Sequence, residues 1–275
     1  KKHPLLLDKI EIRETTLKQY FECPRKWLFK NVLKLSPLDN EAELIDEFIL
    51  GTVNHKIFEN FFTKLFEKKS LLCPSDDDNE KLGEENRKLL VSAINEAGGI
   101  SPESKKSAFK QFFDSNDDGK TVQSIMTIKI IASQYRIDDE KECTKNPNFC
   151  MLEKSIAHFC DIFRGYKVHA LEKEIQALPE GADETKYYFS GKIDCILSSS
   201  NESEFAVVDY KTSLMPVNIF VKDGAVIDFQ MPLYLYLLEN AIEEGDRLKN
   251  VTSAVFYSIK KGEDKPFLFQ APNGK

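Results

Sequence analysis

The sequence lacks the features that mark membrane and secreted proteins. No apolar run approaches the length of a membrane span, and no segment resembles a signal peptide. The six cysteines include no Cys-x-x-Cys pair, so a zinc site is not expected and reduced thiols are the default. We therefore expect a cytoplasmic protein with no membrane partner.

An excess of basic charge is also missing. The net charge of −7 and the pI near 5.4 argue against electrostatic binding of nucleic acid over the whole surface, although a local basic groove stays compatible with them. The 275 residues suffice for one large domain, or for a domain with a sizeable insertion. Because the chain starts at Lys1 rather than Met, we expect it to be part of a longer protein.

The middle of the chain and its last third differ in pattern. Apolar residues recur at helical spacing in Leu82–Ile94 and Val122–Ile130, and polar turn-rich loops divide this region. The last third is instead rich in β-forming residues. The domains expected are an N-terminal helical part at 1–69, a helical insertion at 70–163 and a catalytic α/β core at 164–275. The strands expected in that core are Val168–Gln176, Lys186–Leu197, Glu204–Thr212 and Val251–Ile259.

An acid and a base interrupt one of these apolar strands. Asp209 and Lys211 are two positions apart and therefore share a face of the strand. Their burial costs desolvation energy unless a site uses them, whereas an exposed pair of this kind is usually a weak ion pair. If the hairpin folds symmetrically about Asn201 and Glu202, Asp194 lies opposite Asp209.

The pairing of Asp194 with Asp209 indicates a metal site. Opposed side chains in a sheet lie roughly 5 Å apart at Cβ, and two carboxylates at that distance repel unless one is protonated or a cation lies between them. Oxygen ligands suit Mg²⁺ or Mn²⁺. A neighbouring Lys211 could orient or deprotonate a water and stabilise a developing phosphorane. Gly191 permits close backbone approach here, and the pattern predicts metal-assisted phosphodiester hydrolysis.

Five blocks of sequence together resemble the PD-(D/E)XK nuclease superfamily and, within it, the RecB/AddB-like exonuclease branch. In chain order they are Leu17–Phe29 with its Cys23-Pro24 dipeptide, Gly51-x-x-x-His55, Gly191-x-x-Asp194, Asp209-Tyr210-Lys211-Thr212 and Gln230-x-x-x-Tyr234. Each block is weak alone, but their shared order over most of the chain is specific. The resemblance implies an α/β fold with a restriction-endonuclease-like core, a small mixed β-sheet flanked by helices.

The resemblance also implies roles for individual residues. The catalytic set would be Asp194, Asp209, Lys211, Gln230 and Tyr234; the ligands of Mg²⁺ or Mn²⁺ would be Asp194, Asp209, the backbone carbonyl of Tyr210, and His55 approaching from the helical side. A further acid is expected on the strand before Gly191. Glu172 and Glu174 share a face there, and the family pattern favours Glu172 while leaving Glu174 open.

Basic residues beside aromatic ones are candidates for DNA contacts. Arg25 and Lys26 flank Trp27, and Lys192 lies near Asp194. Interleaved aromatic residues suit stacking on single-stranded bases. The resemblance further implies an exonuclease-type domain of a DNA repair or recombination protein that works with a helicase domain or subunit.

Two further points concern an iron–sulfur cluster and the alternative function. In some relatives a cysteine at the position of Cys23 joins three others near the C-terminus to hold a 4Fe–4S cluster, and no cysteine follows Cys195 here, so we expect no cluster. A non-cleaving DNA-binding or scaffolding module is the alternative function. The intact set of Asp194, Asp209 and Lys211 argues against it, because such modules tend to lose their acids.

Overall fold

The computed structural model describes residues 10–35, 45–73, 81–97, 146–179, 187–212, 221–222, 225–226 and 228–269. Within these ranges no helix has the length and apolar character needed to cross a membrane. The helical elements are α1 (Glu14–Glu22), α2 (Pro24–Trp27), the π-helical turn η1 (Leu28–Val32), α3 (Ile45–Lys68), α4 (Glu84–Ala97), α7 (Pro147–Ile162), α8 (Gln230–Glu239) and the 3₁₀ turn η3 (Glu244–Asp246).

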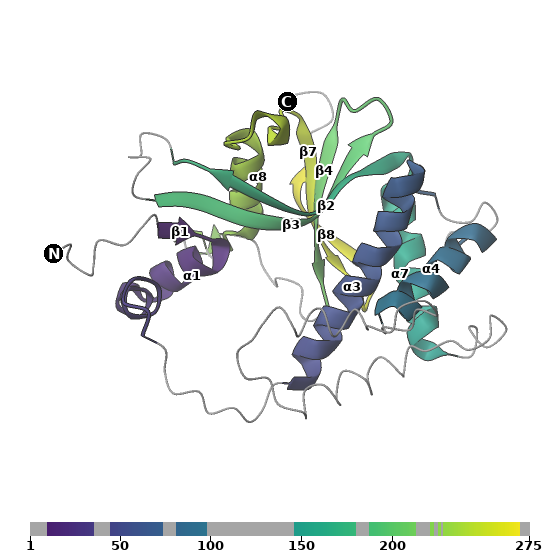
Figure 1. Cartoon of the computed structure of the whole chain (residues 1–275), viewed down its shortest axis with the longest axis horizontal. Helices are drawn as coiled ribbons and strands as arrows, with labels where there is room; N and C mark the ends of the chain where they lie inside the picture. The colour runs from purple at the N-terminus through teal and green to yellow at the C-terminus, as the bar shows by residue number, and fades with distance from the viewer. Residues whose placement is uncertain are drawn as a thin grey trace.

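Six strands form one mixed sheet (Figure 1). They are β1 (Ile10–Ile12), β2 (Tyr166–Ala177), β3 (Tyr187–Ser199), β4 (Phe205–Lys211), β7 (Val251–Ser258) and β8 (Glu263–Phe269), and β5 (Val221–Lys222) pairs separately with β6 (Ala225–Val226). The order is β1-β3-β4-β7-β8, with β2 paired to β3. The β1–β3 and β4–β7 pairs are parallel and the others antiparallel. The expected α/β class and its four strands are confirmed.

Two strands were not expected from the sequence. β1 has three residues, too few for a period-two pattern to be recognised. β8 carries charged residues and Pro266, which lower its apparent strand character. Proline and charges are tolerated at the end of a sheet, where one side of the strand needs no partner, and β8 ends the strand order.

The β3–β4 hairpin has the register that the sequence predicts. Cys195 pairs with Val208 and Leu197 with Ala206, so the hairpin is centred between Asn201 and Glu202. The Asn201 side chain accepts the backbone N–H of Ser203 at 3.2 Å, and Glu202 has a φ of +57°. Asparagine stabilises such turns with its own side chain. Asp194 and Asp209 are the next residues beyond the last ladder pair.

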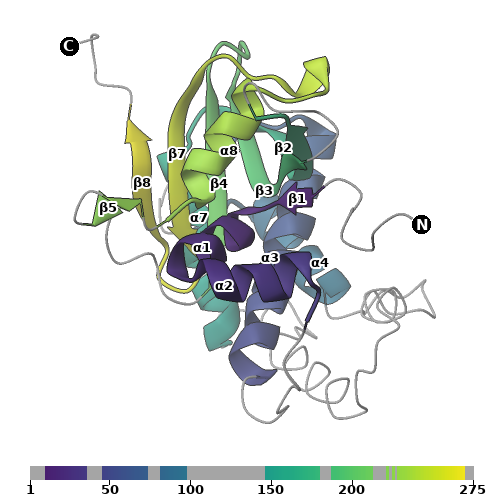
Figure 2. The ribbon, with the colours of Figure 1, turned by 90° about the vertical axis from the view of Figure 1, so that its left-hand side faces the viewer.

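Helices cover both faces of the sheet (Figures 1 and 2). On one face α3, α4 and α7 share a buried cluster with strand residues, and on the other face α8 packs in a second cluster. The first cluster includes Phe58, Phe62, Leu90, Phe149, Phe159, Leu197, Val208 and Tyr257. The second includes Ile193, Ile196, Val207, Phe256, Met231 and Leu237. The sheet is therefore the middle layer of three.

The described helices of the 70–163 region pack directly into the first cluster. Leu90 of α4 and Phe159 of α7 are fully buried there. Asn146 caps α7 by accepting the backbone N–H of Asn148 at 3.0 Å, and Pro147 occupies the first turn, where its missing N–H costs nothing. The expected helical segment Val122–Ile130 lies outside the described residues.

Candidate active site

Strand β4 presents Asp209 and Lys211 on the face covered by α8. Val207 belongs to the α8-side cluster, whereas Val208 and Tyr210 belong to the α3-side cluster. Asp209 is 2% exposed, and Lys211 Nζ lies 2.6 Å from its Oδ2. The acid and the base therefore share a face, as the alternation predicts, and the acid is buried while the side chain of Lys211 is 26% exposed.

Strands β3 and β4 separate where Asp194 begins to contact β4. Their ladder ends at the Cys195–Val208 pair. One residue further on, the carboxylate of Asp194 accepts the backbone N–H of Tyr210 at 2.7 Å. A buried N–H requires a partner, and here a side chain replaces the ladder carbonyl. The acid is therefore held beside the Asp209–Lys211 segment by the backbone of β4.

Strands β2 and β3 both change the face that they present at the level of Asp194. On a regular strand Ile193 and Cys195 would share a face, but Ile193 is in the α8-side cluster and Cys195 in the α3-side cluster. On β2, Leu171 packs against the α3-side cluster and Ile175 lies in the α8-side cluster, although these residues are also an even number apart. Regular alternation is therefore broken in both strands at this level.

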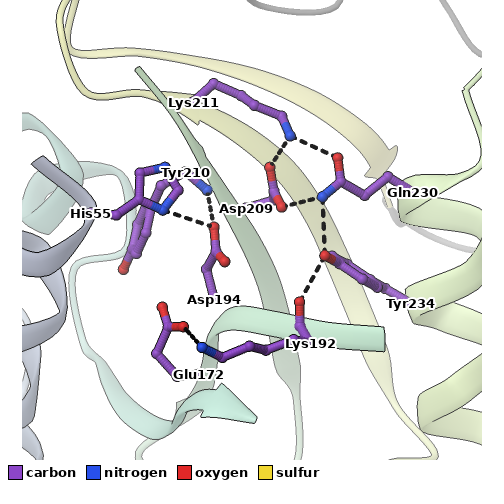
Figure 3. Close-up of polar contacts among 9 residues, drawn as sticks. All are labelled: His55, Glu172, Lys192, Asp194, Asp209, Tyr210, Lys211, Gln230 and Tyr234. Carbon is purple, nitrogen blue, oxygen red and sulfur yellow. Dashed lines mark hydrogen bonds and ion pairs between the residues drawn. The ribbon is translucent and has the colours of Figure 1, made fainter. Parts of the chain in front are cut away.

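Glu172 lies at this break. The register pairs on either side of it place Glu172 across from Asp194, and its φ is +49°, a region that residues other than glycine rarely occupy. Its carboxylate forms an ion pair with Lys192 Nζ. Glu174 is exposed and pairs in register with Lys192. The structure therefore brings Glu172, and not Glu174, next to Asp194 (Figure 3).

Helix α3 brings His55 to Asp194 from the opposite side. His55 Nδ1 lies 3.8 Å from Asp194 Oδ2. Burial above all, and then the charge of Lys211, lower the pKa of His55 to about 4 against an opposing hydrogen bond with the Tyr210 backbone. The imidazole is therefore neutral at pH 7, which is the form that can act as a metal ligand.

Helix α8 supplies a hydrogen-bonded chain that runs from Lys211 to β3 (Figure 3). Gln230 Oε1 accepts from Lys211 Nζ at 2.7 Å, and Gln230 Nε2 donates to Asp209 Oδ1 and, at 3.0 Å, to the Tyr234 hydroxyl. That hydroxyl donates to the carbonyl of Lys192 at 2.8 Å. The whole Gln230 amide is satisfied, so it is held in one orientation.

Two glycines allow the helices to approach this closely. A Cβ at Gly191 would lie 2.7 Å from Leu237 Cδ1 and 3.2 Å from Tyr234, both on α8. A Cβ at Gly51 on α3 would lie 2.9 Å from the hydroxyl of Thr212, at the end of β4. Close backbone approach is the reason for glycine at both places. The Gly51-x-x-x-His55 spacing thus sets α3 against β4 and brings His55 to the site.

The two aspartates suit a cation. Burial, followed by the charge of Asp209, raises the pKa of Asp194 well above its usual value, and burial raises the pKa of Asp209 against the opposing charge of Lys211. Buried carboxylate oxygens of this kind fit a hard divalent ion, which would relieve their repulsion. In the described residues, however, no three His, Cys, Asp or Glu side chains converge as a ready metal cage.

The basic residues expected to contact DNA lie in different settings. Lys192 is half-exposed and paired with Glu172. Arg25 and Lys26 are exposed on α2, with the Arg25 guanidinium 5.6 Å from the centre of the Phe29 ring. Among the described residues, neither Arg25 nor Lys26 has a carboxylate within ion-pair distance. Both side chains are exposed and can therefore be reached by phosphate groups.

Two acids near the site were not recognised from the sequence. Asp228 accepts the backbone N–H of Gln230 at 3.0 Å, and its charge acts on Asp209. Glu14, at the start of α1, is half-buried, and its pKa is raised by burial and then by Asp228. The Asp-x-Gln spacing at the start of a helix could have indicated the first. The position of Glu14 depends on long-range folding and left no local signal.

A pair of carboxylates and a lysine between splayed strands of a mixed sheet, with helices on both faces, define a restriction-endonuclease-like α/β protein. Residues 14–273 match the family model of the PD-(D/E)XK nuclease superfamily, and the chain belongs to that superfamily. Members of this superfamily are generally nucleases that hydrolyse phosphodiester bonds and typically use divalent metal ions.

One further similarity covers a short stretch. Over 56 residues the chain is 29% identical to an uncharacterized protein of Treponema pallidum (strain Nichols). The stretch is 20% of this chain and 7% of that protein. The match is therefore limited to a small part of a much longer protein and gives no information about activity.

Proposed function

We propose that this chain is a metal-dependent deoxyribonuclease and the exonuclease-type domain of a larger DNA repair or recombination protein. The observation that carries the proposal is the contact of Lys211 with the buried Asp209, with the half-buried Asp194 beside them. Removing two acids from most of their water costs free energy that a structural role does not require, whereas phosphodiester hydrolysis uses both acids and the neighbouring lysine. Membership of a nuclease superfamily supports the same chemistry.

The residues of the site have different roles in the proposed hydrolysis. Asp194 and Asp209 would hold Mg²⁺ or Mn²⁺, with His55, Glu172 and the Tyr210 carbonyl as further donors. When bound, the ion supplies positive charge against the scissile phosphate and acidifies the attacking water. Lys211 orients that water and stabilises the negative charge that develops on the phosphate. Gln230 holds Lys211 in place, and Tyr234 holds Gln230.

The finer parts of the proposal rest on the resemblance to the RecB/AddB-like branch. The ordered blocks from Leu17 to Tyr234 support an exonuclease that acts at DNA ends, with a helicase domain or subunit as its partner in the cytoplasm. A non-cleaving scaffold is disfavoured because both acids and the lysine are present, and Gln230 contacts Lys211 and Asp209.

Cleavage assays test the proposal directly. Linear single- and double-stranded DNA and a closed circle are incubated with the protein in EDTA, MgCl₂ or MnCl₂. We expect metal-dependent degradation of linear DNA only, lost in Lys211→Ala and retained in the control Lys167→Ala, whose lysine pairs with Glu202 at the surface. Undiminished cleavage by Lys211→Ala would sink the assignment, and efficient cutting of the circle would overturn the exonuclease mode.

A metal titration separates the enzyme from the scaffold. We expect calorimetric Mn²⁺ binding to the wild-type protein and its loss in Asp194→Ala, with Asp161→Ala as the control on a surface ion pair with Arg164. Absence of Mn²⁺ binding to the wild-type protein would favour the scaffold.

A further inference from the structure

Exposed apolar side chains are concentrated at the N-terminal end of the described chain. Tyr20 is 44% exposed, Phe21 65% and Phe29 39%, and the exposed leucines nearby are Leu28, Leu33 and Leu35. We call Tyr20, Phe21, Trp27 and Phe29, on α1, α2 and η1, the aromatic surface. Large exposed rings clustered in this way mark a binding surface rather than ordinary scatter.

Three rings of this surface, those of Phe21, Tyr20 and Trp27, form a row that starts beside the candidate active site. Phe21 stacks on Phe229 with ring centres 5.0 Å apart and planes inclined by 17°, and Phe229 directly precedes Gln230. Phe21 meets Tyr20 edge to face at 5.5 Å, and Tyr20 meets Trp27 at 5.3 Å. Figure 2 shows α1 and α2 on the side that faces the viewer, below the end of α8.

The charge of this segment is opposite to that of the chain. Residues 14–35 contain five basic residues, Lys18, Arg25, Lys26, Lys30 and Lys34, and two acidic ones, Glu14 and Glu22, which gives +5 − 2 = +3 in a chain of net charge −7. All five basic side chains are exposed. A local positive charge on an acidic protein attracts a polyanion to this segment.

We propose that the aromatic surface binds the unpaired bases of single-stranded DNA and leads that strand to the active site. This deepens the proposed nuclease function and rests on it. Each base has two faces that stack on aromatic rings, and the basic residues between the rings pair with the phosphates. Duplex DNA offers no free base faces along its length, because its bases already stack on one another.

The observations favour DNA over a partner protein as the occupant. Arginine also occurs in protein-binding patches, but here the exposed Arg25 and Lys26 lie among the rings in a segment of net positive charge, which suits the phosphates of DNA. The row also ends beside Gln230, which holds the catalytic lysine. A strand following the rings therefore arrives at the site that cuts it.

The test compares DNA with and without bases. Anisotropy in EDTA measures binding of the full chain to a labelled oligothymidylate of about 20 nucleotides and to an abasic chain with the same phosphates. We expect tighter binding of the oligothymidylate and a roughly tenfold loss in Phe21→Ala, with abasic and duplex binding unchanged. Phe21→Trp keeps a ring and retains affinity. The control Phe66→Ala removes a ring that is 47% exposed on α3 and changes nothing.

Two results would overturn the proposal. One is equal oligothymidylate affinity in Phe21→Ala and Phe66→Ala, which is also the outcome if the surface binds a protein. The other is an equal loss of abasic binding, which would show a charge or folding effect. Thermal melting of Phe21→Ala checks the fold.

A small substrate separates this proposal from the nuclease function. The p-nitrophenyl ester of thymidine 5′-phosphate has one base and is too short to occupy the row of rings, so we expect the wild type to hydrolyse it with Mn²⁺ whether or not the surface binds DNA. If the wild type cleaves neither this ester nor DNA, the proposed nuclease function is wrong. The anisotropy measurements then still test whether the aromatic surface binds single-stranded DNA. If the wild type cleaves both but Phe21→Ala binds DNA normally, only the proposed role of the aromatic surface is wrong.

Discussion

Gln230 accepts a hydrogen bond from Lys211 Nζ at 2.7 Å, and the same amide donates to Asp209. The lysine is thus positioned by a neutral group on α8 as well as by its neighbouring acid. A carboxylate that takes up a cation has less charge to offer a lysine, whereas an amide keeps its hydrogen bond unchanged. Gln230 is therefore the residue whose loss tests how Lys211 is oriented.

Gln230→Ala is expected to lower the rate of cleavage by roughly 10–100-fold, because a small displacement of a catalytic group has an effect of this size. The KM for DNA is expected to change little, since Gln230 acts through Lys211. Single-turnover cleavage and DNA titration measure the two quantities. Gln176→Ala, at an exposed position on β2, is the matched control. A large rise in KM with an unchanged rate would mean that Gln230 binds DNA instead.

Tyr234→Phe and Tyr236→Phe form a matched pair on α8. Each hydroxyl donates to a backbone carbonyl, that of Lys192 at 2.8 Å for Tyr234 and that of Leu178 at 2.9 Å for Tyr236. Both changes are expected to lower the free energy of unfolding by about 1 kcal/mol. Only Tyr234→Phe is expected to slow cleavage, because only Tyr234 contacts Gln230. Equal activity of the two variants would contradict the proposed chain of contacts.

Gly191→Ala is expected to destabilise the protein by about 1–3 kcal/mol, because the added methyl group overlaps Leu237 Cδ1. Urea unfolding measures the change. In a Leu237→Ala background the overlap disappears, so the added cost of Gly191→Ala is expected to shrink. Gly245→Ala is the control, since nothing lies within 4 Å of a Cβ there. If the destabilising effects of Gly191→Ala and Leu237→Ala simply add in the double variant, the contact with Leu237 is not what excludes a side chain at position 191.

Asp194→Asn is expected to stabilise the metal-free protein by about 1–2 kcal/mol while abolishing cleavage. The amide oxygen can still accept the Tyr210 N–H, and the charge that repels Asp209 is gone. Melting in EDTA measures the gain. MnCl₂ is expected to raise the melting temperature of the wild-type protein but not of the variant. A variant that is less stable than wild type near pH 8 would refute the repulsion.

The same comparison has an expected dependence on pH. In the folded protein, burial and then the charge of Asp209 raise the pKa of Asp194 above 3.8. The folded wild type therefore binds a proton more tightly than the unfolded chain and gains stability as the pH falls through the raised pKa towards 3.8. The stability difference between Asp194→Asn and wild type is thus expected to be largest near pH 8 and to narrow near pH 5. If this stability difference does not change with pH, it has a cause other than the titration of Asp194.

Local pattern sufficed for the four central strands and for the register of the β3–β4 hairpin. The symmetry of the hairpin about Asn201 and Glu202 is seen in the Cys195–Val208 pair, because turn chemistry and period-two alternation act over few residues. The choice between Glu172 and Glu174 could not be made in this way. It depends on the positive φ of Glu172 and on a change of face across two strands, which regular alternation does not anticipate.

The sequence by itself determined the α/β class, the strand that carries Asp209 and Lys211, and the position of Asp194 across the hairpin, since each follows from short-range periodicity. Only the tertiary structure decided that Gln230 bridges Lys211 and Asp209, that Glu14 and Asp228 lie near them, and that a row of rings joins α1 to α8. These contacts join residues far apart in the chain. Their positions follow from how helices pack on a twisted sheet, and that packing is a property of the whole fold.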